Sequence, residues 1–130
     1  MPRSAIPDAR RTIALHFTVP GAPVPFTRVL RGSKQPRAER YRAYKTEVGY
    51  RAKLAGAEPL VGPIGVYVQI SEPDPACRRY DIDNVLKAVI DGLIGVAFVD
   101  DRQIVRAEVS IYQDREANAR IHVVGEEAER

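Results

Sequence analysis

The chain has 130 residues, of which 45% are hydrophobic and 28% are charged, a length and composition that fit one globular domain with a single core. Its 20 basic and 17 acidic residues give a net charge of +3, and its one cysteine excludes an intrachain disulfide and a cysteine-rich zinc site. The sequence lacks an apolar stretch long enough to span a membrane and lacks the apolar core of a secretory signal, which favours a cytoplasmic protein. We expect a mobile N-terminal arm at residues 1–10 and one domain at 11–130.

Hydrophobic patterning predicts six elements in the order β-α-β-α-β-β. Residues 11–20 alternate as a strand does, and the proline-rich residues 21–36 predict a long loop of the kind that often carries function. A mostly exposed amphipathic helix over 38–54 and a strand over 62–74 follow.

A second helix is expected from Asp83 to about Ile94, and two strands over 103–114 and 119–127 should form a hairpin. The predicted fold class is therefore α/β (α+β): a small mixed sheet of about four strands with two main helices packed on it.

Charge is unevenly distributed along the chain. Residues 28–53 carry nine basic and two acidic side chains, whereas residues 81–101 carry five aspartates and one lysine. A basic surface beside an acidic cluster suits a metal-dependent enzyme that acts on nucleic acid. A solvated helix face and ordinary helix caps would explain the same charges, so charge alone leaves both interpretations open.

The acidic segment begins with "DIDN" at the start of the second predicted helix. Asp83 is well placed as the N-cap, and Asp83, Lys87 and Asp91 fall in one row at i, i+4 and i+8, where they would form weak ion pairs. These local roles leave Asp81 unexplained. Two carboxylates two residues apart, facing the same way, raise each other's pKa unless a cation lies between them, and hard oxygen ligands favour Mg²⁺ or Mn²⁺.

A second acidic group, Asp100 and Asp101, follows the apolar run 96–99. An Asx turn could account for one of these residues. If residues 95–101 run back along the second helix, a span of at most about 25 Å, one of the two carboxylates would complete a three-carboxylate metal site with Asp81 and Asp83. Such a site serves metal-assisted phosphoryl transfer, in which Lys87 would stabilise charge on the scissile phosphate.

Other classes of enzyme use a D-x-D pair or a nucleophilic side chain. Phosphatases with an aspartyl nucleophile need the pair directly after an apolar strand, and nucleotide-sugar transferases need a larger chain. His16 and His122 lie in predicted strands away from any nucleophile, and Cys77 has only Arg78 and Arg79 beside it, which argues against serine or cysteine catalysis.

The segments "DIDNVLKAVIDGL" and "VDDRQI" resemble the signature of the RusA-type Holliday junction resolvases, small dimeric endodeoxyribonucleases of bacteria and phages. The order of elements and the length agree with that family over about residues 11–125. The sequence departs from the family in having Tyr80 where a basic residue often precedes the first motif aspartate, and in its more basic proline loop.

The resemblance implies a Mg²⁺-dependent homodimer, in which Mn²⁺ can substitute, that cuts two strands of a four-way DNA junction symmetrically and leaves 5′-phosphates. It assigns the catalytic roles to Asp81, Asp83, Lys87 and Asp101, of which the three aspartates are the metal ligands. Asn84, Asp91 and Asp100 would support them. We expect DNA phosphate contacts from the loop and from the segment before the motif, namely from Arg28, Arg31, Lys34, Arg78 and Arg79.

Overall fold

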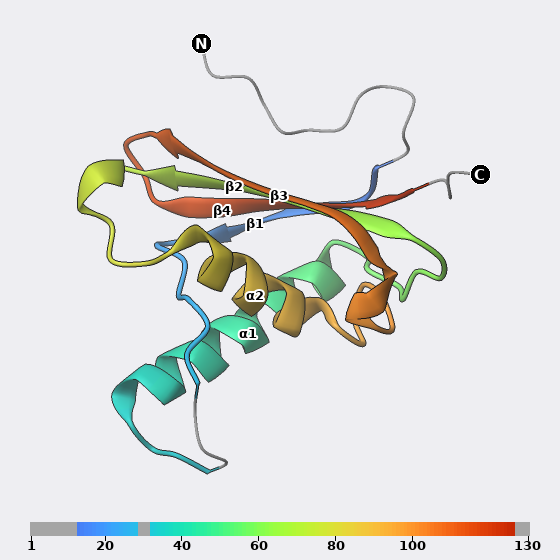
Figure 1. Cartoon of the computed structure of the whole chain (residues 1–130), viewed down its shortest axis with the longest axis horizontal. Helices are drawn as coiled ribbons and strands as arrows, with labels where there is room; N and C mark the ends of the chain where they lie inside the picture. The colour runs from blue at the N-terminus through green and yellow to red at the C-terminus, as the bar shows by residue number, and fades with distance from the viewer. Residues whose placement is uncertain (1–12, 29–31, 127–130) are drawn as a thin grey trace.

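The computed structural model describes residues 13–28 and 32–126, which form one sheet with two helices on one of its faces (Figure 1). The predicted N-terminal arm lies outside these residues. The elements in chain order are β1 (Ile13–Pro20), α1 (Pro36–Leu54), β2 (Ile64–Glu72), α2 (Ile82–Leu93), β3 (Ile104–Gln113) and β4 (Asn118–Gly125), with short 3₁₀ turns η1 (Pro75–Cys77) and η2 (Asp101–Gln103). This order confirms the predicted fold class.

The strands lie in the order β1-β4-β2-β3, in which β4 is antiparallel to both of its neighbours and β2 is parallel to β3. The predicted hairpin of the last two strands is therefore wrong, because β2 lies between β3 and β4. Burial explains the arrangement. All residues of β2 from Ile64 to Ser71 are buried, whereas β3 is half-exposed or exposed throughout, so β3 suits an edge of the sheet.

The core lies between the sheet and the two helices. Leu15, Phe17 and Val19 alternate inward from β1, as the sequence pattern predicts. From α1 the buried side chains include Tyr41, Tyr44, Val48 and Ala52, and from α2 they are Val85, Ala88, Val89 and Leu93. Leu54, the last residue of α1, is 68% exposed.

The helices touch backbone to backbone at a pair of glycines. A Cβ added to Gly92 would lie 2.8 Å from the carbonyl oxygen of Lys45, and one added to Gly49 would lie 3.0 Å from that of Gly92. This contact fixes α2, and with it the acidic segment, against α1.

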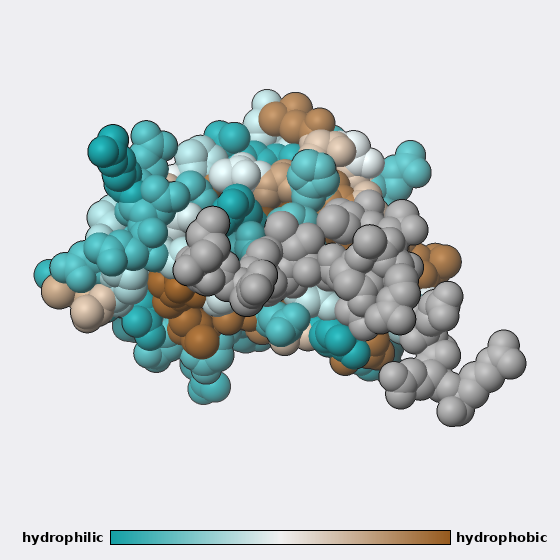
Figure 2. Space-filling model, turned by 90° about the horizontal axis from the view of Figure 1, so that it is seen from above, coloured by the Kyte–Doolittle hydropathy of each residue, from teal (hydrophilic) through white to brown (hydrophobic). Residues whose placement is uncertain are grey.

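The opposite face of the sheet carries polar residues in register. His16 faces His122 across β1 and β4, and His122 faces Tyr67 across β4 and β2. Figure 2 views this side and shows a mostly hydrophilic surface, with a few separate apolar patches, around the atoms drawn in grey. Within the described ranges, neither helix is long and apolar enough to cross a bilayer.

Candidate functional site

The start of α2 presents the D-x-D pair to solvent. The helix begins at Ile82, so Asp81 is the N-cap and Asp83 lies in the first turn, which corrects the prediction that Asp83 is the cap. The carbonyl oxygen of Asp81 accepts hydrogen bonds from the N–H groups of Asn84 and Val85, both at 3.1 Å. In the described part of the chain neither carboxylate is engaged in capping the helix, and both are exposed. Two unengaged carboxylates thus stand together at a helix start, where the helix dipole favours negative charge.

Lys87 and Asp91, one and two turns further along α2, contact other elements. The Nζ atom of Lys87 lies 4.6 Å from the centroid of the Phe26 ring. The hydroxyl of Tyr41 donates a 2.5 Å hydrogen bond to Asp91, and burial together with this carboxylate raises the pKa of Tyr41. Within the described ranges no ion pair within 4.0 Å joins Lys87 to Asp83 or Asp91, so the predicted row of pairs does not form.

The loop that follows β1 is attached to this helix. The N–H of Phe26 donates to the carbonyl oxygen of Asn84 at 2.8 Å, and the Phe26 ring packs edge-on against Tyr41 with centroids 5.3 Å apart. The backbone of Asn84 therefore fixes the loop whose Phe26 ring lies against Lys87.

Asp100 is the N-cap of η2 and Asp101 is its first residue, and Asp100 has a local structural partner. Asp100 accepts from the N–H of Arg102 at 2.8 Å and from its Nε and Nη2 atoms at 3.2 and 2.9 Å. These contacts lower the pKa of Asp100 from 3.8 to about 2. Gln103 completes the turn by accepting from the N–H of Asp100 at 3.0 Å. Asp101 is exposed on the same turn.

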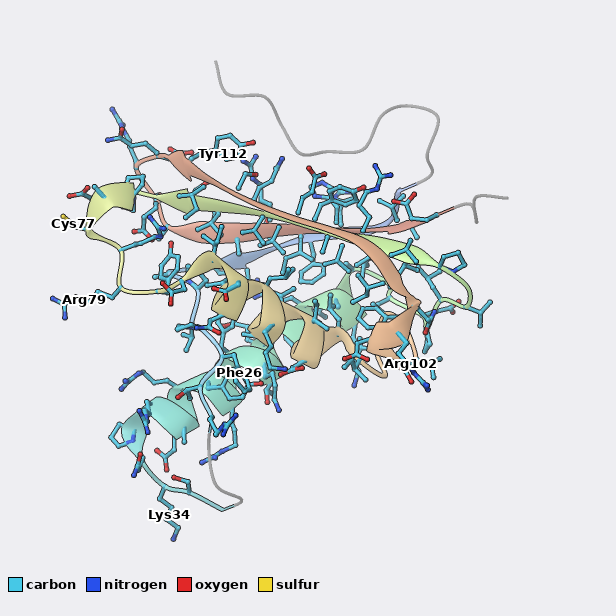
Figure 3. All side chains as sticks on the ribbon, in the orientation of Figure 1. Phe26, Lys34, Cys77, Arg79, Arg102 and Tyr112 are labelled. Carbon is cyan, nitrogen blue, oxygen red and sulfur yellow. The ribbon has the colours of Figure 1, made fainter. Side chains whose placement is uncertain are left out.

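The two acidic groups lie at opposite ends of α2 (Figure 3, where Arg79 and Arg102 mark the two ends). The helix has 12 residues and is therefore about 18 Å long. Contrary to expectation, residues 95–101 do not run back along the helix. The N–H of Gly95 donates to the carbonyl oxygen of Phe98, so the chain turns at the end of α2. The side chain of Gln103 donates to the carbonyl oxygens of Leu60 and Gly62, which holds η2 at that end. The reason is topological: β3 is parallel to β2 and must begin where β2 begins, so α2 itself is the return path.

The carboxylates have the right chemistry for Mg²⁺ but are not gathered within one chain. Among residues 13–28 and 32–126, no group of three or more histidine, cysteine or acidic side chains is close enough to hold a metal ion. A single subunit therefore does not fit a closed three-ligand metal centre.

The predicted DNA contacts fall on two segments. Arg28 and Lys34 are exposed in the loop before α1, and Arg31 lies outside the described residues. Arg78 and Arg79 are exposed in the turn that leads to Asp81, with Arg78 donating to the carbonyl oxygen of Pro75 at 3.0 Å.

A cleft of about 580 Å³ separates these two segments. It is lined by the loop residues 22–27, by Arg37 and Arg40 of α1, by Glu72 and by residues 77–80. In the sequence, Arg37 and Arg40 belong to the basic segment 28–53 and to no motif. Arg37 and Arg40 are three residues apart at the start of a helix, and this spacing indicates in the sequence that the two side chains share one helix face.

The histidines and the cysteine do not join the carboxylates. The His16 and His122 rings stack with centroids 6.0 Å apart on the sheet face away from the helices. Cys77 is exposed in the wall of the cleft. Neither arrangement provides a nucleophile with an adjacent base.

Comparison with known proteins identifies the family of the chain. The family model described as endodeoxyribonuclease RusA matches residues 20–124, which include both acidic groups, the loop after β1 and all elements from α1 to β3. A search of curated proteins finds no match. The chain therefore belongs to the RusA family, the endodeoxyribonucleases that resolve Holliday junctions.

Proposed function

We propose that this protein is a Mg²⁺-dependent endonuclease that cuts two strands of a four-way DNA junction symmetrically during recombination and repair. One observation carries the proposal: the exposed carboxylates of Asp81 and Asp83 stand beside a cleft rimmed by arginines. Arginines attract the phosphate backbone, and paired carboxylates would repel it unless a cation lies between them. Mn²⁺ would satisfy the same oxygen ligands.

The catalytic set is Asp81, Asp83, Lys87 and Asp101. A bound divalent ion would polarise the phosphoryl oxygens and favour deprotonation of water. Lys87 lies against Phe26 and is an exposed residue, which suits a contact with the scissile phosphate. Hydrolysis of the bond between phosphorus and the 3′ oxygen leaves a 3′-hydroxyl and a 5′-phosphate, the ends that a ligase joins.

The active form in this proposal is a homodimer with composite sites. Asp101 is about one helix length from the D-x-D pair of its own chain, so a three-carboxylate site requires Asp101 from a second subunit. A two-fold axis would create two such sites, one for each strand cut.

The surface around Asp101 supports contact with a second copy. Five large apolar side chains are exposed at the ends of α1 and α2, in the loop before β2, before η2 and at the start of β3: Leu54, Val61, Ile94, Val99 and Val105. Exposed apolar residues gathered at one end of a small protein are typical of an interface.

In the same proposal Arg28, Arg31, Lys34, Arg78 and Arg79 contact DNA phosphates. Asn84, Asp91 and Asp100 support the site without binding the metal, since Asp91 and Asp100 already accept hydrogen bonds from Tyr41 and Arg102. Residues 11–130 act as a single nuclease domain in the cytoplasm of a bacterium or of a phage-infected cell.

The test is a cleavage assay with a synthetic four-way junction and a linear duplex of matched sequence, each with Mg²⁺ or with EDTA. We expect paired cuts in the junction only, and only with Mg²⁺. Asp83→Asn should abolish cutting and keep or improve junction binding, because it removes negative charge near phosphates. Equal cutting of both substrates would contradict the resolvase proposal.

A non-catalytic DNA-binding dimer is the main alternative, and it predicts junction binding without cutting at any metal concentration. An acidic pair facing phosphates weakens such a binder, which favours the enzyme. A nuclease for other branched nucleic acids is the second alternative, and the same assay with flaps and RNA junctions separates it from a junction resolvase.

A further inference from the structure

The cleft between the loop after β1 and the segment before α2 has the features of a nucleotide site. It has a volume of about 580 Å³, within the usual range for small-ligand pockets. Its walls combine apolar and aromatic groups with four arginines. We propose that this cleft takes one unpaired, unstacked nucleotide from the branch point of the DNA, an inference that rests on the proposed function.

The apolar wall of the cleft is firmly built. Phe26 is fixed by its backbone hydrogen bond to Asn84, by its edge contact with Tyr41 and by Lys87 above its ring. Tyr80, which also lines the cleft, donates a 2.6 Å hydrogen bond to Glu72, which orients its ring. Aromatic side chains that are held in place in a cleft are the kind of surface on which an exposed base stacks.

The rim of the cleft is cationic. Arg37, Arg40, Arg78 and Arg79 line it, and Glu72 is its one acidic lining residue. Within the described residues none of these arginines forms an ion pair within 4.0 Å, and the Glu72 carboxylate is already bound to Tyr80. Four guanidinium groups around an apolar interior match a nucleotide, which has a flat base and a phosphate on either side.

The cleft leads directly to the candidate catalytic residues. Tyr80 immediately precedes Asp81, and a second hollow of about 360 Å³ is lined by Ala76 and residues 78–81, so the two hollows share Arg78, Arg79 and Tyr80. A nucleotide held against Tyr80 would place its neighbouring phosphate near Asp81 and Asp83.

This arrangement provides selectivity for branched DNA. In a linear duplex every base is paired and stacked, so filling the cleft requires a base to be unpaired and unstacked, which costs free energy. At a branch point the base stack is already interrupted, so the same insertion costs less. The basic rim alone would bind both kinds of DNA.

The experiment pairs a protein change with a DNA change and measures binding with Ca²⁺ in place of Mg²⁺. Each branch-point nucleotide of the junction is replaced in turn by an abasic residue, and a matched junction carries the abasic residue in the middle of an arm. We expect one branch-point position to weaken binding about tenfold, the order expected for a stacked base, while the arm position changes it less than twofold.

In Tyr80→Ala, an abasic residue at that branch-point position should no longer weaken binding of the junction. In Tyr80→Phe, which keeps the ring, the abasic residue should still weaken binding. The proposal would be overturned if the abasic residue weakened binding equally in the wild-type protein and in Tyr80→Ala. It would also be overturned if no branch-point abasic residue weakened binding to the wild-type protein. Because binding is measured, junction cleavage by the wild-type protein tests the proposed function separately.

Cys77 supplies a second measurement that needs no variant. It is the one cysteine of the chain, it is exposed, and it lines the cleft. The four-way junction should slow its alkylation by iodoacetamide at least fivefold, and saturating linear duplex should not. Equal protection by both DNAs would show that the cleft is merely covered by DNA and does not receive a branch-point nucleotide.

Discussion

The ammonium group of Lys87 lies 4.6 Å from the centroid of the Phe26 ring, so the loop after β1 holds the lysine of the acidic motif. The spacing of Asp83, Lys87 and Asp91 on one helix face suggests a different arrangement, a row of ion pairs. Asp91 instead accepts from Tyr41, and Asp83 remains exposed. The lysine and the D-x-D pair are therefore positioned independently, the former by an aromatic contact and the latter by the start of the helix.

The contact between Phe26 and Lys87 should be measurable as a coupling. In a double-mutant cycle of Phe26→Leu and Lys87→Met, followed by urea unfolding, we expect a coupling free energy of about 0.5–1 kcal/mol. The exposed Lys53 serves as the control, since Phe26→Leu and Lys53→Met should be additive. Additivity in both cycles would show that the ring does not hold the lysine.

Composite sites predict that two inactive variants restore each other. In a mixed dimer of Asp83→Asn and Asp101→Asn subunits, one composite site carries both substitutions and the other carries neither. Mixing the two variants should therefore restore nicking of one strand of the junction, at up to about half of the wild-type rate per mixed dimer, because one of its two sites is intact.

The matched control mixes Asp81→Asn with Asp83→Asn. Because both residues come from the same subunit's side of each site, every site in that mixed dimer keeps one substitution, and no activity should return. Failure of Asp83→Asn and Asp101→Asn to restore nicking, although mixed dimers form, would mean that Asp101 does not act across subunits.

Gln103 should position η2. Its side chain accepts from the N–H groups of Val99 and Asp100 at 2.9 and 3.0 Å and donates to the carbonyl oxygens of Leu60 and Gly62, both at 2.9 Å. Gln103→Leu should lower the free energy of unfolding by about 1–3 kcal/mol, because these backbone groups lose their partner. It should also slow cleavage, since Asp101 lies on the same turn.

Gln113 provides the control for that substitution. It makes one long bond of 3.4 Å to the carbonyl oxygen of Pro73 at the end of the edge strand, and it is exposed. Gln113→Leu should stay within about 0.5 kcal/mol of the wild type in chemical denaturation. Similar losses for the two variants would argue against a special role for Gln103.

The glycine contact between α1 and α2 predicts that alanine in place of Gly92 destabilises the protein, although alanine favours a helix more than glycine does. Alanine is better than glycine in a helix by about 1 kcal/mol, yet a Cβ at Gly92 would meet the Lys45 carbonyl at 2.8 Å and the Cβ of Val48 at 3.0 Å. Gly92→Ala should therefore destabilise the protein by about 1–3 kcal/mol in urea unfolding. Gly49→Ala, with its nearest atom at 3.0 Å, should cost less, and a stabilised Gly92→Ala protein would contradict the close approach.

His122 should make stability depend on pH in the mildly acidic range. Burial, followed by the charges of His16 and Arg120, lowers the pKa of His122 below its usual 6.5. As pH falls below about 6.5, the unfolded chain takes up a proton that the folded protein resists, so the free energy of unfolding falls until the pH passes the lowered pKa. Thermal unfolding should show a smaller drop from pH 7 to pH 5 in His122→Gln than in the wild type, and equal slopes would exclude His122 as the source.

Local patterns determined the elements of this protein and pointed to its candidate site residues. Alternation in β1 and the helical stripe of Val85, Val89 and Leu93 encode which side of each element is buried, and the spacing of the acidic residues carries the family signature. The predicted N-cap, Asp83, is wrong by two residues. Aspartate is a good N-cap at either position, and only the backbone conformation decides between Asp81 and Asp83.

The tertiary structure decided which elements are neighbours. Periodicity is local, whereas the insertion of β2 between β3 and β4 depends on competition among all strands for the buried centre of the sheet. That choice makes β3 parallel to β2 and sends Asp101 to the far end of α2 from Asp81. The sequence by itself supplied three carboxylates, but their separation within one subunit, the contact of Lys87 with Phe26 and the cleft beside Tyr80 arise only from long-range packing.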